Sequence, residues 1–139
     1  MSVIDENQVE LQCIDWFKEL QYQYKNGSEL KPESSETERS DLRDVILKDR
    51  LNKSLTKLNP ELNKKIIDKV VTQILNPNIS GLANCNREIH TWMAKGLKTI
   101  YMKDDQEIGH QLKLIDYINL ENNDFLVVNQ FEVKGDKRL

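Results

Sequence analysis

Apolar residues recur at helical spacing through the first two thirds of the chain. Four such stripes predict amphipathic helices, over about residues 6–21, 41–58, 60–75 and 85–95. Ser40 and Asp41 are typical of a helix start, because a hydroxyl can cap the helix and an acid in the first turn favours its dipole. Asn59-Pro60 is expected to end one helix and to cap the next. Almost no loop then separates these two helices, so we expect an antiparallel hairpin.

After Gly96 the apolar pattern changes from helical spacing to alternation. Three stretches predict strands, over about residues 97–102, 111–118 and 124–133, with a turn at residues 103–107. The last strand is the most apolar, and both of its faces are apolar at its beginning, which is typical of a sheet covered by helices. Helices and strands together predict an α/β fold whose sheet begins after Gly96.

The apolar strand near the end of the chain also predicts that the sheet is incomplete. A long apolar strand with an unpaired edge invites aggregation, and complete domains usually cover such an edge. Residues 134–139 resemble a hairpin turn that leads into a further strand. We therefore expect the parent protein to continue beyond Leu139 and to supply the missing neighbour.

A polar and charged segment over residues 30–40 predicts a loop. It contains Pro32 and few apolar residues, so we expect it to be mobile, although Leu30 could be pinned to the body of the protein.

Composition and the N-terminus predict a soluble protein of the cytoplasm. No apolar run approaches the ~20 residues needed to span a bilayer, and the first residues lack the basic and apolar parts of a secretory signal. Cys13 and Cys85 do not make a disulfide framework, which suits a reducing compartment. Cys85 and His90 could form half of a zinc site, but a structural zinc needs four ligands, so an ordinary thiol and an ordinary histidine are favoured.

Charge is distributed unevenly along the chain. The net charge of −3 argues against strong unaided binding to nucleic acid. Residues 1–30 carry two basic and six acidic side chains, whereas residues 45–75 carry seven basic and three acidic ones. The basic stretch has two interpretations: a patch that faces phosphates, or the solvated outer face of two amphipathic helices. Periodicity alone predicts the solvated face, which is therefore favoured.

A decamer near the end of the chain carries a resemblance to a known family. Residues 122–131 read NNDFLVVNQF, which resembles the signature of the N-terminal nuclease domain of type I restriction endonuclease R (motor) subunits. Further parts of the chain resemble the same domain: residues 6–22, 39–60, 86–96 and 114–117. One departure is Gln21, where family members often have a glycine, and it leaves the following loop in question.

The resemblance implies an activity for the parent protein. It implies the fold of metal-dependent restriction nucleases and an ATP-dependent subunit that cleaves foreign, unmodified duplex DNA together with modification and specificity subunits. In that family, Mg²⁺ is held by an Asp after a Pro and by an acid two positions before a Lys, on strands that follow the decamer. Carboxylates suit this hard cation. We place none of these catalytic residues in this chain and find no P-loop for ATP, so the segment alone is expected to be inactive.

Glu10 is the best candidate for a magnesium ligand within the chain. In related nucleases a glutamate on the first helix can face the metal, and Glu10 lies beside Ile14 and Phe17 on the predicted helix. The alternative, a solvated helix glutamate, is favoured because most helix carboxylates are exposed. Asn129 and Gln130 are expected to hydrogen-bond backbone in the core or, failing that, to contact DNA.

Two other functions stay open. The chain could be a non-catalytic module that docks onto DNA or partner subunits through the basic helices, with weak and strongly salt-dependent DNA binding. It could also be the remnant of a decayed gene. A Pro-Asp and an acid-x-Lys pair within a few dozen residues after Leu139 would favour the nuclease.

Overall fold

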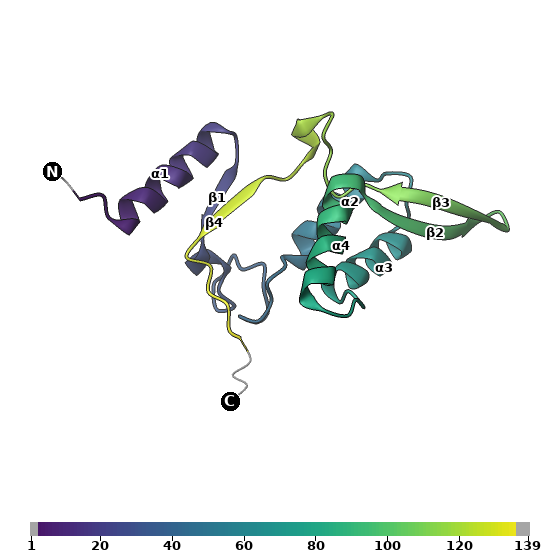
Figure 1. The fold of residues 1–139 in the computed structure, drawn as a ribbon, viewed down its shortest axis with the longest axis horizontal. Coiled ribbons are helices and arrows are strands. Elements are labelled where there is room, and N and C mark those ends of the chain that lie inside the picture. Colours follow the sequence, from purple (N-terminus) through teal and green to yellow (C-terminus); the bar gives the residue numbers. More distant parts are fainter. Residues whose placement is uncertain (1–2, 136–139) are drawn as a thin grey trace. The chain divides into compact units, whose positions relative to one another are not determined.

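The computed structural model describes residues 3–135 and mixes helices with short strands, which confirms the predicted α/β class. The chain forms two compact units (Figure 1). The first unit takes in the chain up to residue 47 and again from residue 125 onward, and the second unit is residues 48–124. None of the helices among residues 3–135 is both long and apolar enough to cross a membrane.

The first unit begins with helix α1, Glu6–Glu19. Asp5 caps it: the Asp5 carboxylate accepts from the backbone N–H of Gln8 at 2.8 Å, and the Gln8 side chain accepts from the backbone N–H of Asp5 at 3.3 Å. The helix ends two residues earlier than predicted, because Gln21 adopts a positive φ of 70° that turns the chain. Ile14 is its one buried side chain.

Strand β1, Gln23–Asn26, pairs in parallel with β4, Leu126–Asn129. In this register Asn26 lies opposite Asn129. β1 was not predicted, since its residues show no apolar alternation. β4 is much shorter than the predicted strand over 124–133 and ends where Gln130 takes a φ of 53°. Its residues are half-buried, and within the described part of the chain its other edge has no partner.

The segment after β1 is irregular, as predicted, but buried side chains hold it to the unit. A 3-10 helix, η1, covers Gly27–Leu30, and the Leu30 side chain is fully buried, which confirms that it is pinned. Arg39 is also buried, and its guanidinium donates to the carbonyls of Leu30 at 2.7 Å and Glu132 at 2.9 Å and stacks 4.2 Å above the Phe131 ring.

The prediction that a helix begins at Ser40-Asp41 is wrong. The Asp44 carboxylate accepts from the backbone N–H groups of both Ser40 and Asp41, at 3.2 and 3.1 Å. These bonds close a turn instead of capping a helix, which is a common use of short acidic side chains. Helix α2 therefore begins later, and covers Lys48–Leu58.

The second unit packs helices α2, α3 and α4 against a two-stranded hairpin. Their bounds are α3 Lys64–Leu75, α4 Leu82–Lys95, β2 Leu97–Lys103 and β3 Gln106–Leu112. Helices α2 and α3 contact each other, as the predicted hairpin requires. The fully or largely buried core consists of Leu55, Leu62, Ile67, Val70, Val71, Trp92, Leu97 and Leu112.

Asn59 does not cap α3, contrary to prediction. The cap is Asn63, whose side chain accepts from the backbone N–H of Ile66 at 3.0 Å. Asn59 is instead buried, and its amide nitrogen donates to the carbonyls of Leu55 and Lys113, both at 2.9 Å. Its amide oxygen accepts from the backbone N–H of Lys113 at 2.8 Å. This side chain therefore joins the end of α2 to the segment after β3.

Gly96 ends α4 with a φ of 88°, as predicted. The helix begins at Leu82, three residues before the predicted start, after Gly81 with a φ of 87°. β2 and β3 pair antiparallel around a tight turn at Asp104 and Asp105, which is shorter than the predicted turn at 103–107. They form a sheet of their own. The expectation that the last strand, β4, belongs to the sheet that begins after Gly96 is therefore wrong.

The predicted strand over residues 111–118 is wrong beyond Leu112. The chain there folds around Asp116, whose carboxylate accepts from the backbone N–H groups of Ile118 at 3.0 Å and Asn119 at 2.9 Å. Asp116 is buried and does not lie in a sheet. A short 3-10 helix, η2, follows at Leu120–Asn122.

Candidate functional site

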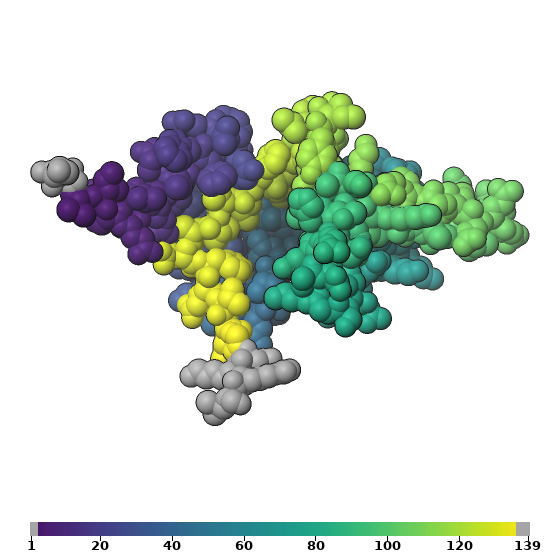
Figure 2. Space-filling view, viewed as in Figure 1, coloured from purple at the N-terminus to yellow at the C-terminus, as the bar shows by residue number. Residues whose placement is uncertain are grey.

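A pocket of about 410 Å³ lies in the first unit at the carboxyl ends of β1 and β4. Parallel strands bring their carboxyl ends to one edge, and α/β proteins commonly bind ligands there. Residues 130–135, which follow β4, run along the surface of this unit and are coloured yellow in Figure 2. The pocket is lined by Asn26, Ser28, Lys31, Gln130, Phe131 and Glu132.

Glu10 and Gln130 meet beside this pocket. The Gln130 amide nitrogen lies 2.9 Å from one carboxylate oxygen of Glu10 and 3.1 Å from the other, so it donates to both. The Gln130 side chain is exposed and that of Glu10 is half-buried. This hydrogen bond to the Glu10 carboxylate joins helix α1 to the residue after β4, although Glu10 and Gln130 lie 120 positions apart in the sequence.

Gly27 allows Gln130 to take its unusual backbone conformation. A Cβ atom built at Gly27 would collide with the carbonyl of Gln130 and press on the nitrogen of Phe131. Position 27 therefore has no room for a side chain as long as the backbone of Gln130 and Phe131 keeps this position. Gln130 has a positive φ and packs against a glycine that has no room for a side chain. Such a strained turn is typical of a functional site.

Asn129 holds the two strand ends together through side chains. Its amide oxygen accepts from the Tyr24 hydroxyl at 2.7 Å and from the Asn26 amide at 3.3 Å. The prediction that Asn129 and Gln130 bond to backbone is therefore wrong, because both bond to side chains. Tyr24 and Asn26 lie on the same face of β1, a strand that the sequence pattern does not predict.

Lys31 and Glu132 form an ion pair of 2.8 Å at the rim of the pocket. The hydrogen bond and the charge of Lys31 lower the pKa of Glu132, and Glu132 raises the pKa of Lys31 in the same way. Glu132 with Lys134 also has the acid-x-Lys spacing, which the sequence reasoning overlooked. In the structure both residues follow β4 in irregular chain, and the Glu132 carboxylate is engaged with Lys31.

The described residues do not by themselves fit a magnesium site. Mg²⁺ requires near-octahedral oxygen coordination, usually with one or two carboxylates from the protein. Glu10 supplies one carboxylate, which accepts from the amide nitrogen of Gln130. Between residues 3 and 135 no three His, Cys, Asp or Glu side chains are grouped closely enough to hold a metal.

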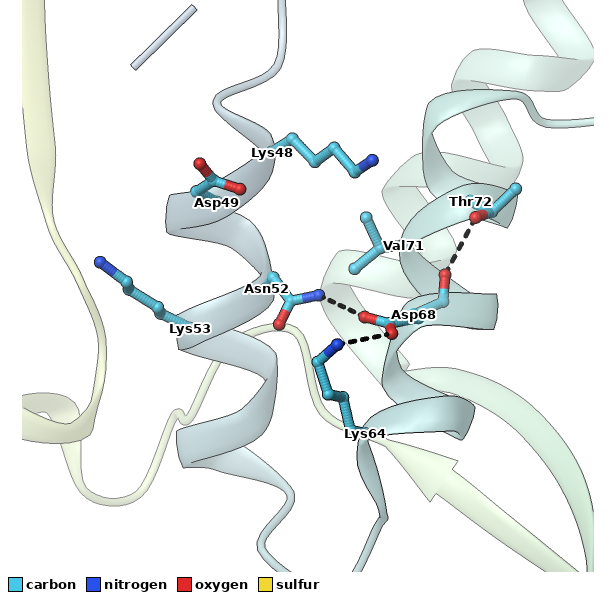
Figure 3. A pocket seen from close by; sticks show the side chains of 8 residues that line it. All are labelled: Lys48, Asp49, Asn52, Lys53, Lys64, Asp68, Val71 and Thr72. Carbon is cyan, nitrogen blue, oxygen red and sulfur yellow. Dashed lines mark hydrogen bonds and ion pairs between the residues drawn. The ribbon is translucent and has the colours of Figure 1, made fainter. Parts of the chain in front are cut away.

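The second unit has a groove between α2 and α3 (Figure 3). Its volume is about 570 Å³, and it is lined by Lys48, Asp49, Asn52, Lys53, Lys64, Asp68, Val71 and Thr72. Asp68 accepts from the Asn52 amide at 2.9 Å and pairs with Lys64 at 3.5 Å. The hydrogen bond from Asn52, and then the nearby lysines, lower the pKa of Asp68.

The decamer contributes separately to each unit. In the second unit, the Asn122 amide donates to the Asp116 carboxylate at 3.1 Å, and Asn123 bonds to the backbone N–H and carbonyl of Asp116 at 2.8 and 2.7 Å. Asp124 pairs with Arg50 at 2.7 Å. In the first unit, the Phe125 ring packs on Tyr22 with centroids 4.9 Å apart.

Comparison with known proteins gives consistent results. The family model described as type I restriction enzyme R protein N terminus matches residues 4–139. A protein of Methanocaldococcus jannaschii, named as an endonuclease subunit of the type I restriction enzyme MjaIXP, is 38% identical over 91% of the chain. The type I restriction enzyme HindI endonuclease subunit of Haemophilus influenzae is 27% identical over 99% of the chain.

The chain spans only 12% and 13% of the length of these two relatives. No solved structure matches it. The family model nevertheless covers nearly all of the sequence, including both units and the whole decamer. The chain belongs to the family of type I restriction enzyme R protein N termini.

Proposed function

We propose that this chain is the N-terminal part of the nuclease domain of a type I restriction R subunit. The parent subunit, with Mg²⁺ and ATP, cleaves foreign duplex DNA that lacks the host modification, in a complex with modification and specificity subunits. The observation that supports this most strongly is the family match over residues 4–139, together with two relatives named as endonuclease subunits. We expect the segment alone to be inactive, because no three His, Cys, Asp or Glu side chains between residues 3 and 135 are grouped closely enough to hold a metal.

Glu10 is proposed as the ligand that this segment contributes to the magnesium site. Glu10 is half-buried, and its carboxylate accepts from Gln130, which follows the carboxyl end of β4 and lies within the decamer. Mg²⁺ would stabilise charge on the attacked phosphate when bound. Gln130 orients the carboxylate of Glu10 by donating to both of its oxygens. Gly27 supports this arrangement, because it leaves room for the backbone of Gln130.

The test is a cleavage assay on the R subunit that contains this segment, assembled with its modification and specificity subunits. The wild-type complex should linearise an unmodified plasmid, and only when both Mg²⁺ and ATP are present. Glu10→Ala should lower cleavage by about 10–100-fold, as losses around metal sites commonly do. It should leave ATP hydrolysis unchanged, because no P-loop occurs in this segment.

Glu19→Ala is the matched control, since Glu19 lies on the same helix and is exposed. It should cleave like the wild type. A wild-type complex that leaves unmodified DNA intact would contradict the proposed function. Full cleavage by the Glu10→Ala complex at limiting Mg²⁺ would contradict only the role of Glu10.

A further inference from the structure

Positive charge is concentrated on two neighbouring helices of the second unit. Helices α2 and α3 together carry seven basic and two acidic side chains, a net charge of +5. The whole chain has a net charge of −3, so the rest of it carries −8. A difference of this size between parts of one small protein is typical of a surface that meets a polyanion.

The groove between these helices presents donors that suit phosphate oxygens. Lys48 and Lys53 from α2 and Lys64 from α3 line it and are exposed, with the Lys64 side chain 87% accessible. Figure 3 shows the Lys48 and Lys64 side chains reaching into the space between the helices. Val71 is buried at its base. Three of the seven basic residues of these helices thus line one hollow, and two acidic residues, Asp49 and Asp68, line it as well.

We propose that the α2–α3 groove binds the phosphate backbone of duplex DNA. The choice of DNA as the polyanion rests on the proposed function, and the charge and shape of the groove come from the chain itself. Ammonium groups that neutralise phosphates give affinity without reading the bases. Binding should therefore be independent of sequence and strongly dependent on salt.

Asp68 limits the affinity of this groove. Its carboxylate lies among the lysines, pairs with Lys64 at 3.5 Å and is held in place by the Asn52 amide at 2.9 Å. Asp68→Asn keeps an oxygen that can accept from Asn52 and removes the negative charge. This substitution should raise the affinity for DNA severalfold, a direction that general loss of structure would not produce.

The experiment measures binding of the 139-residue chain to a labelled duplex by fluorescence anisotropy between 50 and 200 mM salt. The wild type should bind weakly, with affinity that falls as salt rises. Lys48→Gln, Lys53→Gln and Lys64→Gln combined should weaken binding at least about tenfold and should lower the salt slope by about two to three. The control combines Lys95→Gln, Lys98→Gln and Lys103→Gln, which remove the same charge from exposed positions outside the groove. Circular dichroism checks that each variant is folded.

Each result bears on the inference separately from the proposed function. Equal losses in the two triple variants, no wild-type binding at 50 mM salt, or no gain with Asp68→Asn would overturn the groove as a DNA site. If the groove triple variant loses binding to the modification and specificity subunits but binds DNA like the wild type, the groove is a site for a protein partner and the DNA proposal is overturned. Any of these outcomes is compatible with plasmid cleavage by the full complex, whereas a complex that does not cleave refutes the proposed function even if the groove binds DNA.

Discussion

The buried amide of Asn59 provides a sharp test of how the second unit is held together. Replacing Asn59 with alanine removes three hydrogen bonds, to the Leu55 carbonyl and to both backbone groups of Lys113. Each contributes about 0.5–1.5 kcal/mol net, and a buried group left without a partner adds a penalty of similar size. Asn59→Ala should therefore lower the free energy of unfolding by about 3–4 kcal/mol, a large part of the stability of a small domain.

The comparison variant is Asn63→Ala, which removes the cap of α3 and should lower the free energy of unfolding by about 1 kcal/mol. The assay is urea unfolding followed by tryptophan fluorescence. Trp92 is largely buried in the second unit, and Trp16→Phe removes the other, exposed tryptophan from the signal. If Asn59→Ala is no more destabilising than Asn63→Ala, Asn59 acts as an ordinary cap and the reasoning is refuted.

Three further predictions concern single side chains. Gly27→Ala should destabilise the first unit by about 2 kcal/mol or more through the collision with Gln130, visible as faster amide hydrogen exchange in β4. Backbone hydrogen bonds lower the pKa of Asp116, so its ionised carboxylate stabilises the fold above pH 3.8, and this stabilisation is lost as pH falls through the lower folded pKa. Asp116→Asn should flatten the dependence of the free energy of unfolding on pH in this range. An unchanged dependence would rule the effect out. Lys31→Ala should raise the Glu132 pKa toward its ordinary 4.5 in an NMR titration, since the lost hydrogen bond and charge are what depress it.

Periodicity predicted the elements that have a clear apolar face. Helix α1, helix α4 and strand β2 lie close to their expected positions, and Gly96 ends α4 because a positive φ there favours glycine. Apolar content alone was misleading in the segment 114–118. Leu114 and Ile115 look like strand residues, but the carboxylate of Asp116 draws the following backbone N–H groups into a turn.

Capping preferences alone could not show which asparagine caps α3. Asn59 and Asn63 are both good caps, and Pro60 favoured the first. In the structure the buried Asn59 side chain bonds to Leu55 and Lys113, and Asn63 caps α3. The tertiary contacts of Asn59 therefore decided the start of α3, against the preference of the Asn59-Pro60 pair.

The candidate site was only half visible in the sequence. Glu10 and the decamer were singled out, but their contact depends on β1, a short polar strand whose partner lies about 100 positions away. No local pattern reports such a pairing. The left-handed conformation of Gln130 was equally hidden, because its side chain gives no preference for a positive φ.

The parallel pairing of β1 with β4 has a consequence for synthesis of the protein. Asn26 leaves the ribosome long before Asn129, so the first unit cannot close until the entire second unit has been made. Closing a flexible loop of about 100 residues opposes folding by roughly 4 kcal/mol. A second unit that folds first would shorten that loop, so its early folding would favour closure of the surrounding chain.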